Sequence, residues 1–102
     1  MKKKDAKVKF SGLKEEMILA LMIADKIYDD FGQELIVTSA RDGEHSKSSR
    51  HYIGAAVDLR SFYFTALELK QVALALKTSL GDEYLVLVER THIHIQLQGC
   101  EI

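Results

Sequence analysis

The sequence has little of what several kinds of site require. Cys100 is its only cysteine, which excludes an internal disulfide and a zinc site built from several thiolates. A metal bound by this chain would therefore need histidine and carboxylate ligands. The chain has no proline, and no repeat, low-complexity segment or long Gly/Ser linker divides it. We expect a single domain over residues 1–102.

Charge of one sign and long apolar runs are also missing. Fourteen basic and fifteen acidic residues give a net charge of -1, so nothing indicates a nucleic-acid partner or an anionic membrane surface. The longest apolar stretch, Met17–Ala24, is far shorter than the roughly 20 residues of a membrane span. Further charged residues follow the basic start Lys2–Lys4, so we expect no secretory signal peptide and synthesis in the cytoplasm.

The hydrophobic pattern predicts two helices. Apolar residues recur at helical spacing over Leu13–Phe31, with Ser11 as the expected N-cap and Gly32 suited to the position after the helix. A second apolar stripe follows Thr65 and Glu68, which have the capping-box spacing, and it ends at Gly81. These helices account for most of the expected core.

Short β-branched and apolar runs predict a small sheet. Lys7–Phe10 alternates weakly and is expected to form an edge strand protected by its lysines. A long polar loop, Ala40–Arg50, separates two of the other strands, and loops of that length in small domains tend to be functional. We expect an α+β fold in which two helices pack on a mostly antiparallel sheet. Its other strands are Glu34–Thr38, Ala55–Leu59, Tyr84–Val88 and His92–Leu97.

Two features of the sequence suggest chemistry. His92 and His94 alternate with isoleucines, so in a strand both imidazoles project from the same face. Taken alone, two polar residues on a solvated sheet face explain this pattern. Asp58 lies between Val57 and Leu59, where a strand would otherwise have an apolar side chain, and a buried carboxylate needs a partner or a metal. A pair with Arg60, or a turn cap, explains Asp58 equally well.

These residues belong to a longer pattern that resembles a known family. Ser49-x-His51-x-x-Gly54-x-Ala56-x-Asp58 matches the S-x-H-x-x-G-x-A-x-D signature of the zinc D-Ala-D-Ala peptidases, whose fold is shared with hedgehog signalling domains. The second part of that signature is similar to the segment from Glu89 to His94 near the C-terminus. The likeness runs from about Thr38 to Leu97.

The resemblance implies a catalytic zinc site. It assigns the zinc ligands to His51, Asp58 and His94, and three protein ligands leave a position open for water. Glu89 corresponds to the general base, and His92 to a histidine that stabilises the oxyanion or only orients Glu89 or the metal. Some members use Glu-x-x-His with that histidine as the ligand, which would make His92 the third ligand. Strand alternation would place Glu89 on the other face, so a turn or bulge at Arg90–Thr91 must redirect it.

A second stretch of the long loop also matches the peptidases. Thr38-x-x-Arg41-x-x-x-His45 resembles a stretch in which the arginine anchors a substrate carboxylate, for which a guanidinium is well shaped. The simpler interpretation of Arg41 is a solvated loop cation, and His45 is assigned no role. Only Asp42 and Glu44 remain of the acidic calcium cluster of hedgehog domains, which favours the enzyme branch.

The expected function is therefore that of a zinc metallopeptidase acting on cell-wall peptides. A D-Ala-D-Ala carboxypeptidase is the first interpretation, because Arg41 suits a free C-terminus, and an L-Ala-D-Glu endopeptidase of the endolysin type is the second. A non-catalytic zinc domain that binds a peptide or partner, and a domain without metal, are alternatives. The enzyme would reach its substrate after phage-induced release or would act on wall fragments in the cytoplasm. The sequence indicates no oligomeric state.

Overall fold

The computed structural model describes residues 1–40 and 54–99. Arg41, His45 and His51 lie outside them, as does most of the predicted loop. Neither helix in the described ranges is long and apolar enough to cross a membrane. In chain order the elements are β1 (Lys2–Lys3), α1 (Glu15–Asp30), β2 (Ile36–Ser39), β3 (Ala56–Arg60), α2 (Ala66–Leu80), β4 (Tyr84–Val88) and β5 (His92–Leu97).

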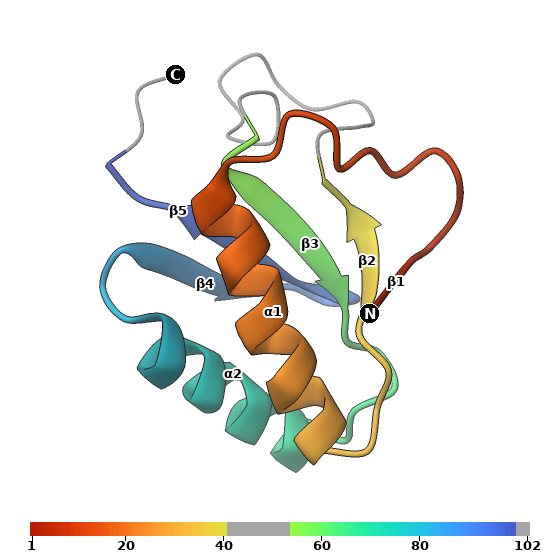
Figure 1. The fold of residues 1–102 in the computed structure, drawn as a ribbon. Coiled ribbons are helices and arrows are strands. Elements are labelled where there is room, and N and C mark those ends of the chain that lie inside the picture. Colours follow the sequence, from red (N-terminus) through yellow and green to blue (C-terminus); the bar gives the residue numbers. More distant parts are fainter. Residues whose placement is uncertain (41–53, 100–102) are drawn as a thin grey trace.

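The strands form one sheet in the order β1-β2-β3-β5-β4. Strands β1 and β2 pair in parallel, whereas the pairs β2–β3, β3–β5 and β5–β4 are antiparallel. Figure 1 shows α1 and α2 lying next to each other across one face of this sheet. The predicted α+β class, with two helices on a mostly antiparallel sheet, is confirmed.

Strand alternation explains which residues enter the core. Val57 and Leu59 of β3, and Ile93 and Ile95 of β5, are fully buried against the helices. The core-facing stripe of α1 includes Met17 and the other fully or nearly buried residues Ala20, Leu21, Ala24, Ile27 and Tyr28. The intervening strand residues, which include Asp58, His92 and His94, therefore lie on the face away from the helices.

The second helix begins and ends as predicted. The Thr65 hydroxyl accepts a hydrogen bond from the Glu68 backbone N–H at 3.1 Å, and the Glu68 carboxylate accepts one from the Thr65 N–H at 2.9 Å. Gly81 follows the helix with φ +76°, a conformation that L side chains rarely adopt. The capping box and the terminal glycine together set the bounds of α2.

The prediction that Ser11 caps the first helix is wrong. The N-cap is Lys14, and its side chain makes no capping hydrogen bond. Gly12 has φ +79°, and the Lys14 N–H donates to the Gly54 carbonyl at 2.9 Å. Residues 12–14 are therefore not helical where they pass Gly54, and α1 begins only at Glu15.

The predicted edge strand Lys7–Phe10 is also wrong. A turn at Asp5 precedes it, in which the carboxylate accepts from the Lys7 N–H at 2.9 Å. Val8 then turns into the core, where it is 1% exposed, and β1 occupies the edge of the sheet beside β2. The burial of Val8 therefore holds this segment as a loop, although its weak alternation suggested a strand. The strands β4 and β5 have the predicted bounds, and β2 and β3 are each displaced by one or two residues.

Candidate functional site

The candidate site lies on the sheet face away from the helices. We call this surface the polar face and define it by Asp58, Arg60, His92, His94 and Gln96. Within the antiparallel pair β3–β5, Asp58 is opposite His94 and Arg60 is opposite His92. Partners in an antiparallel pair project from the same side, so the register places all five side chains on one surface.

Asp58 and His94 lie within hydrogen-bonding distance of each other on this face. The Asp58 Oδ1 atom lies 2.8 Å from His94 Nδ1, and their side chains are only 14% and 16% exposed. The Asp58 carboxylate, unusual for its place in a strand, thus has a histidine partner. The hydrogen bond to Asp58 is the main cause that raises the pKa of His94, against the opposing effect of burial. A hydrogen bond to Gln96 and the charges of Asp58 and Glu89 also raise that pKa.

His92 lies at the edge of the same cluster. Its Nε2 atom is 3.9 Å from Asp58 Oδ1, and its Nδ1 atom is 3.3 Å from the Thr91 hydroxyl. The His92 side chain is 32% exposed, about twice as much as that of His94. The Asp58 oxygen is therefore closer to His94 than to His92, and His92 is the more accessible of the two to a molecule in solution.

The turn between β4 and β5 brings Glu89 to the polar face. Val88 pairs with Ile93, and the Glu89 N–H donates to the His92 carbonyl at 2.9 Å, so the register continues to Glu89 opposite His92. Alternation within one strand does not apply across a hairpin, where the residues flanking a two-residue turn are partners on one side. The turn at Arg90–Thr91 thus redirects Glu89 as the sequence required. Its negative charge contributes to the raised pKa of His94.

The two expected ligands that the structure describes, Asp58 and His94, are of types that zinc accepts. Asp58 Oδ1 and His94 Nδ1 are 2.8 Å apart, and two atoms bound to one tetrahedral zinc at about 2.0–2.1 Å lie roughly 3.3 Å apart. A small opening of the pair would admit the ion. Across residues 1–40 and 54–99, no group of three His, Cys, Asp or Glu side chains is arranged to hold a metal. The third expected ligand, His51, lies outside those ranges.

Gln96 belongs to this cluster, and the sequence analysis missed it. Its Oε1 atom lies 2.8 Å from His94 Nε2, so His94 has a polar partner on each ring nitrogen. Gln96 continues the alternation of His92 and His94 at the next position on the same face, and this spacing was the available signal. The expected substrate ligand Arg41 and the neighbouring His45 lie outside the described residues.

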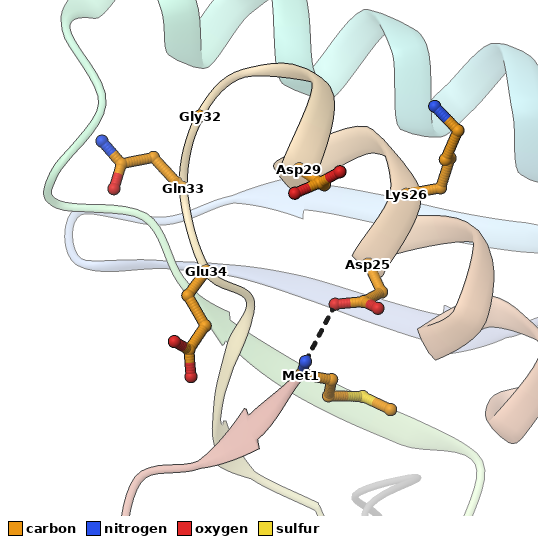
Figure 2. Close-up of a pocket in the computed structure, with 7 residues that line it drawn as sticks. All are labelled: Met1, Asp25, Lys26, Asp29, Gly32, Gln33 and Glu34. Atoms are coloured by element: carbon orange, nitrogen blue, oxygen red, sulfur yellow. Dashed lines mark ion pairs between the residues drawn. The ribbon is translucent and has the colours of Figure 1, made fainter.

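A pocket beside the C-terminal end of α1 offers no comparable site. It has a volume of about 680 Å³, and its Asp25 carboxylate pairs with the Met1 ammonium at 3.1 Å. The Glu34 side chain points away from those of Asp25 and Asp29 (Figure 2). The described residues that line the pocket include neither histidine nor cysteine: they are Met1, Asp25, Lys26, Asp29, Gly32, Gln33 and Glu34. The donor set therefore does not suit zinc.

Comparison with known proteins does not identify a family. No protein-family model matches the chain, and no curated protein matches it.

Proposed function

We propose that this chain is a zinc metallopeptidase that hydrolyses bacterial cell-wall peptides, in the manner of a D-Ala-D-Ala carboxypeptidase. The observation that carries the proposal is the contact between Asp58 and His94, two of the three expected ligands, at 2.8 Å on one sheet face. Its support also includes the resemblance of the 49–58 and 89–94 segments to the zinc D-Ala-D-Ala peptidases.

Asp58 and His94, with His51, would hold the zinc. Bound there, the metal would polarise the scissile carbonyl and lower the pKa of a bound water toward about 7. A carboxylate and two imidazoles are ligands that zinc accepts in catalytic sites, and three of them leave one position for water or substrate. The low exposure of Asp58 and His94 keeps bulk water from competing strongly for these donors.

Glu89 and His92 would handle protons and charge beside that position. Glu89, opposite His92 across the turn, would take the proton of the attacking water and pass it to the leaving nitrogen. His92, the more exposed histidine, would donate a hydrogen bond to the oxygen on which negative charge develops. A domain that only bound peptide would need neither role, which favours the enzyme over the binding module.

Arg41 would select the substrate. A guanidinium forms two parallel hydrogen bonds with a carboxylate, so it would recognise the free C-terminus of a peptide ending in D-Ala. This preference is the reason for proposing an exopeptidase. Such an enzyme would reach its substrate by phage-induced lysis of the cell or would act on wall fragments in the cytoplasm.

Digestion of purified peptidoglycan, with mass analysis of the released fragments, tests the proposal. We expect release of D-Ala by the zinc-loaded protein and none after treatment with a chelator. Cleavage between L-Ala and D-Glu would instead identify an endopeptidase. If no wall peptide is cleaved at full zinc occupancy while peptide binding persists, the enzymatic proposal is refuted and a binding module remains.

A further inference from the structure

The imidazole of His94 is held from both sides. On one side Nδ1 lies 2.8 Å from Asp58 Oδ1, and on the other Nε2 lies 2.8 Å from Gln96 Oε1. The Asp58 carboxylate comes from the neighbouring strand, and Gln96 comes from the same strand as His94, two residues further on. The ring orientation is therefore set by two groups that do not depend on each other.

The contact with Gln96 keeps a hydrogen on Nε2 of His94. An amide oxygen can only accept a hydrogen bond, so the His94 nitrogen that faces it must be N–H. The Asp58 carboxylate, when ionised, also only accepts, so in the zinc-free chain Nδ1 carries hydrogen as well. If zinc takes the place of the hydrogen at Nδ1, the N–H at Nε2 stays with Gln96 and the lone pair of Nδ1 faces the metal.

We propose that Gln96 is a positioning residue that fixes His94 in the Nε2–H tautomer and so presents Nδ1 as the zinc ligand. This inference rests on the proposed zinc site. A metal-binding histidine commonly donates its second N–H to an oxygen acceptor, which fixes the ring and raises its basicity. Gln96 is placed for this task because its cross-strand neighbours, Ala56 and Leu85, have no polar side-chain groups that would divert the amide.

Two variants of Gln96 separate this role from a merely structural one. Gln96→Leu keeps the approximate volume but removes the acceptor, and we expect zinc affinity to fall roughly 10- to 100-fold. Gln96→Glu retains an oxygen that can only accept, so it should bind zinc at least as tightly as the wild type. Gln98→Leu is the matched control, because Gln98 lies just past the end of β5, is exposed and donates to the Asp82 carbonyl.

The measurements are zinc dissociation constants from chelator competition and ¹⁵N–¹H correlation spectra of the histidine rings. We expect the Nε2–H signal of His94 in the zinc-loaded wild type and in zinc-loaded Gln96→Glu, and a weaker signal, through faster exchange with water, in zinc-loaded Gln96→Leu. Circular dichroism of each variant checks that the fold is retained. The inference is overturned if His94 of the zinc-loaded wild type lacks the Nε2–H, or if folded Gln96→Leu binds zinc as tightly as the wild type.

Assaying peptide cleavage on the same samples keeps the two proposals distinguishable. Zinc binding that depends on Gln96 without any cleavage would refute the peptidase and leave the role of Gln96 intact. If peptide is cleaved but the zinc affinity is the same in the wild type and the Gln96 variants, the role of Gln96 is refuted and the peptidase proposal stands. A wild-type chain that binds no zinc would overturn both.

Discussion

His94 Nδ1 lies 2.8 Å from Asp58 Oδ1, although the two residues are 36 positions apart in the chain. Their backbones are paired across β3 and β5, and their side chains are 16% and 14% exposed. An imidazole and a carboxylate at this distance, largely shielded from water, can share either a proton or a metal ion.

Zinc analysis tests the ligand set. We expect about one zinc per wild-type chain, and a large loss of zinc in His51→Ala and Asp58→Ala. Because metal binding contributes to the free energy of folding, both variants should also unfold at lower temperature than the zinc-loaded wild type. Asp82→Ala, which removes an exposed carboxylate outside the polar face, should retain the metal. Undiminished zinc in either ligand variant would refute the assignment.

The two histidines of β5 should behave differently. We expect His94→Ala to lose zinc, because His94 makes the short contact with Asp58. We expect His92→Ala to retain zinc and to lose rate, since His92 is farther from that oxygen and more exposed. Metal content and peptide cleavage are measured on both variants. The reverse result would show that His92 is the ligand and that the Glu-x-x-His register applies.

Replacing Glu89 separates catalysis from binding. Glu89→Gln keeps the size of the side chain and its hydrogen-bonding capacity but cannot accept the proton. Zinc content should be unchanged, and the rate of peptide cleavage should fall by about 10²- to 10⁴-fold. The control for the change of charge is Glu83→Gln, because Glu83 is exposed and lies just before β4, at the end away from Glu89. Equal rates for wild type and Glu89→Gln at equal zinc occupancy would exclude Glu89 as the base.

The zinc-free protein should lose stability as the pH rises. Asp58 raises the pKa of His94 in the folded chain above the ordinary value of 6.5, so protonated His94 stabilises the folded state. This stabilisation is complete below about pH 6.5 and is lost as the pH rises through the folded-state pKa. Thermal unfolding in chelator should therefore show a melting temperature that decreases over this range in the wild type but less in His94→Gln. Parallel pH profiles for the two proteins would contradict the prediction.

Gly54 of the motif has a steric role that a matched glycine lacks. A Cβ on Gly54 would lie 2.1 Å from the Gly12 carbonyl oxygen, whereas one on Gly32, which has nearly the same φ, would meet nothing within 4 Å. Gly32→Ala should lower the free energy of unfolding by about 1–2 kcal/mol, because alanine at this position must adopt the left-handed conformation. Gly54→Ala should lower the free energy of unfolding by a further ~1–3 kcal/mol, because its Cβ would clash with the Gly12 carbonyl. Urea unfolding of the zinc-free variants measures both, and equal losses would show that the Gly12 segment moves aside freely.

Elements whose determinants are local could be predicted from the sequence. The apolar spacing and the capping box of Thr65 and Glu68 predict α2, and alternation predicts β5 and the shared face of His92 and His94. The failures occur where a distant segment decides the conformation. Ser11 does not cap α1 because residues 12–14 cross Gly54, and Lys7–Phe10 is not a strand because Val8 enters the core.

For the site, the sequence by itself determined which donors the chain has and that His92 and His94 share a strand face. That information is local, because side chains two apart in a strand must project from the same side. Only the tertiary structure decided that Asp58 lies opposite His94 and that the turn brings Glu89 opposite His92. Those relationships depend on the register between strands. Burial of Val57, Leu59, Ile93 and Ile95 against the helices and the geometry of the turn set that register, and neither is contained in the spacing of any one segment.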